Sequence, residues 1–94
     1  MPTIIATHEV EDATRWLAAW KKGAGSRHDT FRAHGAPQVR VFQDPKNPKV
    51  TGLLIEVEDM KAFQEFMQSS EVERAKAADG VKSETLKLLA EVNT

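Results

Sequence analysis

The sequence predicts an α+β domain of the ferredoxin-like type, in which the element order βαββαβ builds one antiparallel sheet with both main helices on the same face. The first observation behind this prediction is an internal repeat: the letters EVED occur at 9–12 and again at 56–59. The second is that each copy follows a strand-like apolar run and precedes apolar residues at helical spacing. The third is that another strand-like segment follows each of these helices. The chain is therefore expected to fold as two related halves.

The first half begins with the strand-like letters TIIATH before the first EVED copy. Asp12 is the predicted N-cap of the following helix, because a short carboxylate accepts hydrogen bonds from the free amides of the first turn. In that helix Ala13, Trp16, Leu17 and Trp20 form one apolar stripe.

The second half repeats this order with the strand TGLLI, the N-cap Asp59 and a helix whose stripe contains Met60, Phe63 and Met67. In the register of the repeat, Trp16 matches Phe63 and His8 matches Ile55. The histidine is therefore expected to share a face with apolar residues of its strand.

Two further strands complete the sheet. The segment 37–44, PQVRVFQD, is rich in β-branched and aromatic residues and leads through the turn-forming letters DPKNP into the next strand. The segment 84–92, ETLKLLAEV, closes the chain. Before it, Ser70 and Glu73 resemble a capping box for a short helix through about Ala78, which Gly80 would end.

The composition is that of one globular domain spanning residues 1–94. Hydrophobic residues make up 40% and charged residues 29% of the chain, and the formal net charge is −1. With both signs interspersed, no basic stripe for nucleic acid and no cationic face for a membrane is expected. The chain has no cysteine, which excludes disulfides, thiolate metal sites and a cysteine nucleophile and fits a reducing compartment. No signal peptide or apolar run of membrane-spanning length is recognised, so a soluble cytoplasmic protein is expected.

The predicted strands are apolar on both faces. Leu89 lies opposite Leu86 and Leu88, Leu54 opposes Leu53, and Ile4 opposes Ile5. Because the helices cover only one face, a second copy of the chain is the economical cover for the other. A homodimer with its two sheets packed face to face is predicted.

Over almost its whole length, the sequence resembles the dimeric α/β-barrel superfamily, which includes antibiotic-biosynthesis monooxygenases, polyketide cyclases and stress-responsive barrel proteins. The resemblance rests on HEVEDATRW, on VFQDPKNPKVTGLLIEVED and on SSEVERAKAADGV. It implies a dimeric barrel with a ligand pocket between sheet and helices in each subunit. For the oxygenases it also implies catalysis without metal or flavin, so no cofactor is expected. These motifs specify the fold well and the reaction poorly.

One branch of the superfamily fits less well. Members that degrade haem combine an asparagine on the first strand with a tryptophan and a histidine in the second helical region. Here the first strand carries Thr7 and His8, and neither tryptophan nor histidine occurs beyond His34. This departure argues against haem degradation.

His8 is the first candidate catalytic residue. On the inward face of its strand, beside a small residue, it could line a cavity and act as a general base near neutral pH. The alternative is a histidine tied to a backbone group at the strand end. Trp16 and Trp20, about one turn apart, could form a wall for a planar substrate or could simply be core.

The letters GSRHDTFRAHGA have no counterpart in the repeat. Ser26 with Asp29 resembles a capping box and Gly35 a C-terminal stop, which predicts a short helix from about Arg27 to His34. This insert is expected to form a lid or rim, with His28 as a second candidate proton carrier. Its two histidines and two arginines, Arg27 and Arg32, lie near an aromatic residue and could bind an anionic or phenolate-like substrate, and its candidate ligand-binding residues are Phe31, Arg32 and His34. The alternative is a solvated cationic helix.

Arg40 alternates with Val39 and Val41 along its strand. If it faced inward it would need Glu56 or a substrate acid as partner, because an unpaired buried guanidinium is costly; the alternative is an exposed salt bridge. No metal site is expected from His8, His28 and His34, since the last two are six residues apart and poorly placed for joint ligation from one helix.

Two functions remain open from the sequence. The first is a small cofactor-independent oxygenase- or cyclase-like enzyme acting on a compact aromatic or polyketide-like molecule, with His8 or His28 as base and Arg32 or Arg40 as anion partner. The second is a non-enzymatic homodimer that binds a small ligand or serves as a structural module. A subunit that recruits a different protein is a third possibility.

Overall fold

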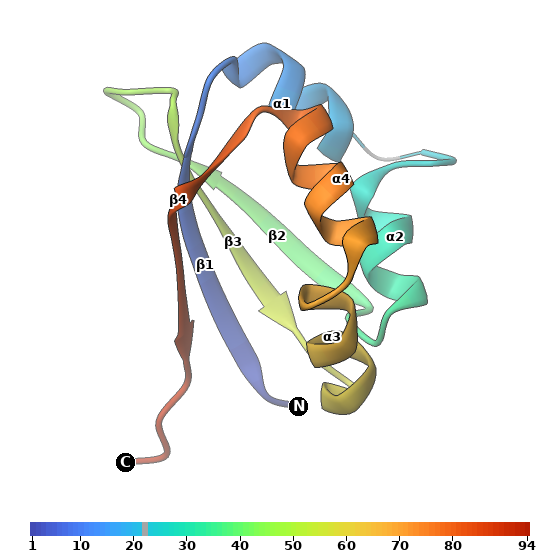
Figure 1. Ribbon diagram of the computed structural model, residues 1–94. Helices are drawn as coiled ribbons and strands as arrows, with labels where there is room; N and C mark the ends of the chain where they lie inside the picture. The colour runs from blue at the N-terminus through green and yellow to red at the C-terminus, as the bar shows by residue number, and fades with distance from the viewer. Residues whose placement is uncertain (22) are drawn as a thin grey trace.

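The computed structural model describes residues 1–21 and 23–94, and within them the predicted order of strands and main helices is confirmed (Figure 1). In chain order the elements are β1 (Thr3–Val10), α1 (Ala13–Trp20), α2 (Arg27–Ala33), β2 (Gln38–Gln43), β3 (Val50–Glu56), α3 (Met60–Met67), α4 (Ser70–Asp79) and β4 (Val81–Ala90). The helix predicted at 27–34 is therefore present as α2, and α4 follows α3 directly.

The sheet has the order β2-β3-β1-β4, with every neighbouring pair antiparallel. The two repeated strands, β1 and β3, lie side by side in its centre, where Ile4 pairs with Ile55 and His8 with Thr51. The ferredoxin-like fold class predicted from the sequence is confirmed. β4 begins at Val81, earlier than predicted, because Gly80 ends α4 in the left-handed conformation at φ 74° and turns the chain straight into the strand.

The predicted caps are confirmed in both repeats. The carboxylate of Asp12 accepts from the amides of Thr14 and Arg15, and that of Asp59 accepts from the amide of Ala62. The cap predicted at Ser70 is wrong by one residue. Ser69 precedes α4 and accepts from the amide of Val72 through its hydroxyl.

The capping box predicted for α2 is only half present. Ser26 occupies the N-cap position, but its hydroxyl makes no capping hydrogen bond. Asp29 instead accepts from the amide of Gly25, at 3.2 Å. The reciprocal hydrogen bond of the box is therefore present but shifted by one residue, from Ser26 to Gly25.

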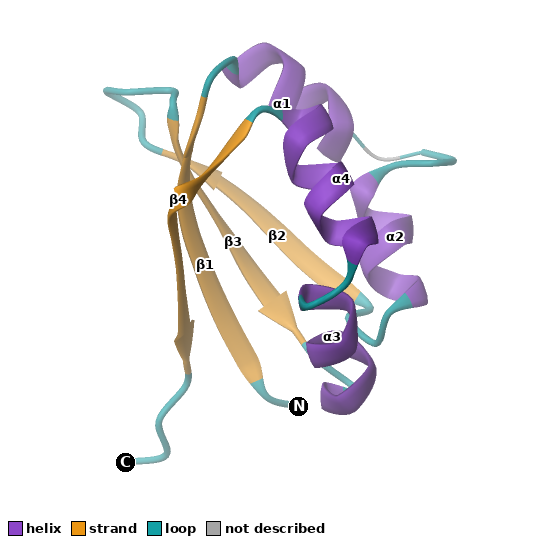
Figure 2. Ribbon diagram, in the orientation of Figure 1, coloured by secondary structure: helices purple, strands orange, loops and turns teal. Residues whose placement is uncertain are grey.

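Within residues 1–21 and 23–94, all four helices lie on one face of the sheet and leave the other face bare (Figure 2). The core forms between them, and its largest fully buried side chains are those of Trp16, Phe63, Ile55, Val10 and Val57. On the bare face Arg40, Leu54, Ile5 and Leu89 follow one another across the four strands. Ile5 is 43% exposed and Leu89 58% exposed.

In the described part of the chain, none of the helices combines the length and the apolar character that a membrane crossing requires.

Candidate functional site

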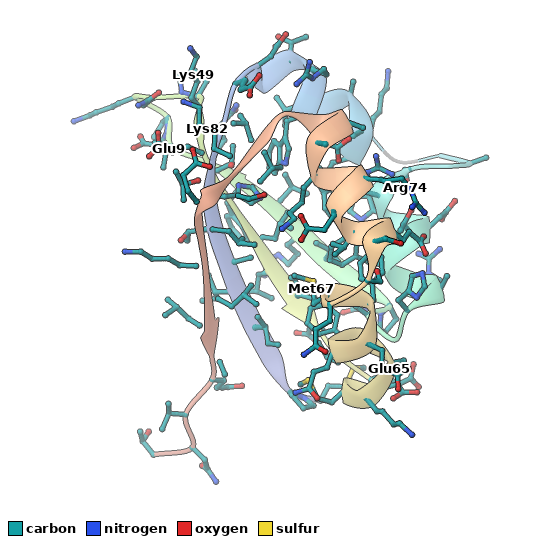
Figure 3. All side chains as sticks on the ribbon, in the orientation of Figure 1. Glu9, Lys49, Glu65, Met67, Arg74 and Lys82 are labelled. Atoms are coloured by element: carbon teal, nitrogen blue, oxygen red, sulfur yellow. The ribbon has the colours of Figure 1, made fainter. Side chains whose placement is uncertain are left out.

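A small cavity lies between the inner face of the sheet and the helices. Its volume is about 50 Å³, roughly the space of a few water molecules. Most of its lining is apolar, and Met67 at the end of α3 points into this space (Figure 3). The sheet contributes Ala6, His8, Leu53, Ile55, Val81 and Leu86, and the helices contribute Trp16, Trp20, Arg27, Phe31, Met67, Val72, Ala75, Lys76 and Asp79.

His8 is the histidine of this lining and is held from the neighbouring strand. It is 6% exposed, and its Nδ1 is hydrogen-bonded to the hydroxyl of Thr51. The same hydroxyl contacts the backbone carbonyl oxygen of His8 at 2.9 Å. A carbonyl only accepts, so the single proton of Thr51 Oγ1 must be donated to it. The hydrogen-bond network therefore assigns the proton of a neutral His8 ring to Nδ1, which donates to Thr51.

This assignment leaves Nε2 of His8 with a free lone pair. Among the described residues Nε2 has no hydrogen-bond partner. It is nevertheless not completely buried, because the completely buried side-chain atoms without a partner do not include it. It therefore borders open space, and the space that His8 lines is the cavity. Burial lowers the pKa of His8 from its ordinary value of 6.5, because charge is disfavoured away from water. The ring is thus a neutral base at neutral pH.

The sheet is irregular beside His8. Between the pairs Thr7 with Lys87 and Glu9 with Lys82, β1 advances two residues while β4 advances five. The hydroxyl of Thr85 bridges the gap by accepting from the amide of Glu9 at 2.8 Å and donating to the carbonyl of Lys82 at 2.6 Å. Glu9 and Lys82 lie together at this point (Figure 3). Such bulges change where neighbouring side chains point, and here Val81 and Leu86 on either side reach the cavity.

Aromatic side chains continue from His8 along the cavity. The ring of Trp16 meets His8 edge-on at 5.5 Å, Trp20 lies 6.5 Å from Trp16, and Phe31 lies 5.1 Å from Trp20. The predicted aromatic wall is thus assembled from α1 and α2, although these residues are also part of the core. The wall and core interpretations of Trp16 and Trp20 therefore describe the same side chains.

The charged groups of the lining come from α2 and α4. Arg27 donates two hydrogen bonds to Asp79, from Nε at 2.7 Å and from Nη2 at 2.9 Å. The side chains are 23% and 10% exposed, so the pair lies where the cavity meets the surface. The hydrogen bond to Asp79 raises the pKa of Arg27. Lys76 also lines the cavity and pairs with the exposed Glu73 at 3.0 Å.

The other predicted site residues lie outside this cavity. His28 packs edge-on against Trp20 at 5.1 Å and borders surface depressions beside β2 rather than the cavity. Arg32 is exposed and pairs with Asp29 in its own helix at 3.1 Å. His34 stacks on Phe66 with a 4.3 Å centroid separation and contacts Glu71 at 3.3 Å.

Arg40 does not face the cavity. The alternation of β2 buries Val39 and exposes Arg40 on the bare face, where its guanidinium lies 5.6 Å from the ring centroid of Phe42. Its strand neighbour is Leu54, whereas Glu56 pairs with Gln38. The expectation that Arg40 or Arg32 is the anion partner of a base at His8 therefore has no geometric support. The arginine that lines the cavity together with His8 is Arg27.

Sequence reasoning included Arg27 only as one of the two arginines of the insert that could bind an anionic substrate, and it missed Thr51, Lys76 and Asp79 as site residues. One signal was available for Asp79, which stands in the last turn of a helix just before Gly80. An acidic side chain is unfavourable at this end of the helix dipole and calls for a cationic partner. Its partner comes from 52 positions away, and sequence spacing does not reveal such a distant contact.

His8 lies on β1, whereas His28 lies on α2 and His34 is the C-cap of the same helix. Across residues 1–21 and 23–94, no three side chains of histidine, cysteine, aspartate or glutamate gather in a way that could hold a metal ion.

No model of a known protein family matches the sequence, and no curated protein matches it either. Solved structures do match over the full length of the chain. A protein from Bordetella bronchiseptica, provisionally named an antibiotic biosynthesis monooxygenase, superposes with a TM-score of 0.71 at 18% identity, over 99% of this chain and 96% of that one. A protein from Deinococcus radiodurans with the same provisional name gives 0.68 at 14% identity, over 100% and 93%. HapK from Hahella chejuensis gives 0.62 at 19% identity, over 100% and 93%.

These similarities cover both halves of the βαββαβ order and the whole sheet. Because the sequence identities are 19% or lower, they establish a common fold and not a common activity. They agree with the resemblance found in the sequence. The chain therefore has the ferredoxin-like α+β fold of solved proteins that are named as antibiotic biosynthesis monooxygenases.

Proposed function

We propose that this protein is a small cofactor-independent oxygenase- or cyclase-like enzyme that removes a proton from a compact aromatic or polyketide-like molecule. The observation that carries the proposal is the state of His8: its Nδ1 proton is engaged by Thr51, and its Nε2 lone pair borders an apolar cavity. A neutral imidazole with one nitrogen oriented by a hydrogen bond is the usual form of a histidine general base.

The lining supports an aromatic substrate. Trp16, Trp20 and Phe31 offer flat apolar surface next to the base, and such rings favour edge-to-face or offset contact with another ring. The apolar surroundings also favour the neutral base before reaction, because the imidazolium would be poorly solvated. Proton transfer then requires a substrate whose own anion is strongly delocalised, as in phenols and anthrones.

For an anthrone the proposed oxidation balances without a cofactor. His8 Nε2 takes a proton from the ring methylene, the resulting carbanion is oxidised by dioxygen, and the CH₂ group becomes C=O. One dioxygen is consumed and one water is released. For a cyclase the same proton removal would instead generate the enolate that attacks a carbonyl within the substrate.

The homodimer predicted from the sequence is part of the proposal. On the bare face of the sheet, Ile5, Leu54 and Leu89 form a continuous apolar line from β3 to β4, and Phe42 lies beside it on β2. Exposed apolar area of this kind typically marks an interface. Packing against the same face of a second copy would bury it.

A non-enzymatic small-ligand module is the second candidate, and the size of the cavity favours it. A volume of about 50 Å³ is well below the roughly 300–1,000 Å³ of sites for drug-sized ligands. An aromatic substrate must therefore displace side chains to enter, whereas a very small ligand need not.

The experiment that separates the two candidates measures oxygen uptake with anthrone as substrate for the wild type, His8→Gln and His28→Gln. The proposal expects loss of turnover in His8→Gln alone, with the thermal transition of both variants retained. Turnover that survives in His8→Gln, or is lost in His28→Gln instead, would remove His8 as the base. No turnover of anthrones, quinols or polyketide acids by the wild type would favour the binding module.

A further inference from the structure

Arg27 and Asp79 form a hydrogen-bonded ion pair in the cavity lining. The rest of that lining is apolar except for His8 and Lys76. The pair joins α2 to α4 through two parallel hydrogen bonds of 2.7 and 2.9 Å. This fork geometry is the one in which a guanidinium binds any carboxylate, whether it belongs to the protein or to a ligand.

We propose that Arg27 is the recognition site for a ligand carboxylate and that Asp79 occupies this position until the ligand enters. The ligand class is an aromatic acid whose ring lies along Trp20 and Phe31 and whose carboxylate replaces that of Asp79 on Nε and Nη2 of Arg27. This inference rests on the proposed function only in placing the ligand in the same cavity. It adds the requirement that the ligand carries a negative charge, which Arg27 would bind.

The charges of the lining favour such a ligand. In the lining, Arg27 and Lys76 carry two positive charges against the one negative charge of Asp79, and Glu73, the carboxylate that pairs with Lys76, is exposed and lies outside the lining. Asp79 also stands at the C-terminal end of α4, where the helix dipole opposes a carboxylate. Arg27 is therefore what stabilises the charged Asp79 at this position, and we treat Asp79 as the group that a ligand carboxylate replaces.

Lys76 could pair with the carboxylate of Asp79 once a ligand has displaced it from Arg27. It lies three residues before Asp79 on α4, a spacing at which helical side chains meet. Its present partner, Glu73, is 62% exposed at the side chain, and an exposed pair of this kind is weak. After exchange both cations would still be paired, so no buried charge would be left alone.

The exchange also addresses the size of the cavity. In its present form the cavity is too small for a ring system, and the Arg27–Asp79 pair links two of the helices that surround it. Separating α2 from α4 at this pair would enlarge the cavity at the surface end and leave His8 and Thr51, which lie on β1 and β3, in place.

The test compares 2-naphthoate with its neutral isostere 2-naphthamide by isothermal titration calorimetry on the full chain. The wild type is expected to bind the carboxylate about 10-fold more tightly than the amide, because a charge-assisted pair is stronger than a neutral one. Asp79→Asn, which removes the competing carboxylate, is expected to raise affinity for 2-naphthoate about 5-fold or more and leave 2-naphthamide unchanged. Arg27→Met is expected to abolish the preference.

Arg74→Met is the matched control. Arg74 lies on α4 as well, but it is exposed and points away from the sheet (Figure 3). The carboxylate preference should persist in this variant. A ratio of affinities that is the same in wild type, Arg27→Met and Asp79→Asn would overturn the proposal, as would equal binding of the two compounds or binding of neither by the wild type.

If a single substitution prevents folding, the double variant Arg27→Met/Asp79→Met replaces it, since it leaves neither charge unpaired. It should bind 2-naphthamide and lose the preference for 2-naphthoate; a retained preference would refute the assignment. His8→Gln distinguishes this inference from the proposed reaction. A protein that prefers the carboxylate with or without His8, yet turns over no substrate, would refute the reaction and support the Arg27 site.

Discussion

His8 and Thr51 hold each other across the two central strands. Thr51 Oγ1 donates to the carbonyl of His8 at 2.9 Å and accepts from Nδ1 of the same residue. Both groups are buried, with Thr51 3% exposed. One hydroxyl thus fixes both the ring orientation and the position of the ring proton. Three measurable consequences of this site, one of the turn at Gly35 and one of the sheet's bare face follow from the structure.

Thr51→Val should release the ring of His8. The substitution keeps the shape of the side chain but leaves the Nδ1 proton without its acceptor, at a cost of about 1–3 kcal/mol in the free energy of unfolding. Long-range ¹⁵N–¹H NMR of the wild type should show Nε2 of His8 unprotonated, and Thr51→Val should show a mixture of tautomers. Thr51→Ser retains the hydroxyl and serves as control. A protonated Nε2 in the neutral wild type would contradict the assignment.

Acidification should destabilise the protein through His8. Burial lowers the pKa of the folded state below the ordinary 6.5, so the unfolded chain takes up a proton at higher pH than the folded chain does. The contribution of His8 to stability is therefore complete above about pH 6.5 and decreases as the pH falls below this value toward the folded-state pKa.

The measurement is the denaturant midpoint between pH 7.5 and 5 for the wild type and His8→Gln. The variant should show a flatter dependence over this range. The charged groups that share the cavity with His8 are Arg27, Lys76 and Asp79, and they are present in both proteins. Identical pH profiles would show that His8 does not titrate as its burial requires.

The Arg27–Asp79 pair should contribute to stability as a coupled unit. Arg27→Met or Asp79→Asn alone should each lower the free energy of unfolding by roughly 1.5–3 kcal/mol, because each leaves a partly buried group without its charged partner. The double variant should lose less than the sum of the two. The exposed pair Arg32–Asp29 provides a matched cycle, with an expected coupling of about 0.5 kcal/mol or less.

Gly35→Ala should be far more destabilising than Gly25→Ala, although both positions have positive φ, at 84° and 79°. A Cβ on Gly35 would lie 2.5 Å from the carbonyl oxygen of Asp59, whereas one on Gly25 meets nothing within 4 Å. The carbonyl of Gly35 also accepts from the amides of Glu58 and Asp59. Thermal denaturation should show a loss of roughly 3 kcal/mol for Gly35→Ala and about 1 kcal/mol for Gly25→Ala. Equal losses would mean that backbone conformation alone matters.

Leu89→Glu should convert the proposed homodimer to a monomer. Leu89 pairs with Ile5 on the bare face of the sheet, and a carboxylate there would have to be buried without a partner. Light scattering gives the mass of wild type and variant. Leu17→Glu is the control, because Leu17 is also exposed, at 40%, but lies on α1. A wild-type monomer, or a Leu89→Glu dimer, would refute the face-to-face arrangement.

The repeat explains why the fold could be predicted from the sequence. The letters EVED place an acidic N-cap two residues after the last strand residue in the first copy and three residues after it in the second. In each copy, apolar residues recur every second position before these letters and about every three to four positions after them. Both signals are local, since caps and periodicity depend on residues within one or two turns. The same alternation correctly predicted that His8 shares a buried face with Ile4, Ala6 and Val10.

The insert shows the limit of this reasoning. A short helix was predictable from the letters of a capping box and a C-terminal glycine, but the directions of the four basic side chains between Arg27 and His34 were not. Arg27 turns to the cavity, His28 to Trp20, Arg32 to Asp29 and His34 to Phe66. Each direction is decided by a neighbour on another turn or another element, and a period of 3.6 residues does not specify that neighbour.

The sequence by itself determined the order of the elements, the face of each strand that is buried, and the presence of a histidine and two tryptophans on the inner side. Only the tertiary structure decided that Thr51 fixes the tautomer of His8, that Asp79 neutralises Arg27, and that Arg40 lies on the opposite side of the sheet from the cavity. The physical reason is the range of the interactions. Strand alternation and helix capping act between near neighbours, whereas the hydrogen bonds of the site join residues 43 and 52 positions apart, which meet only when the sheet and helices pack.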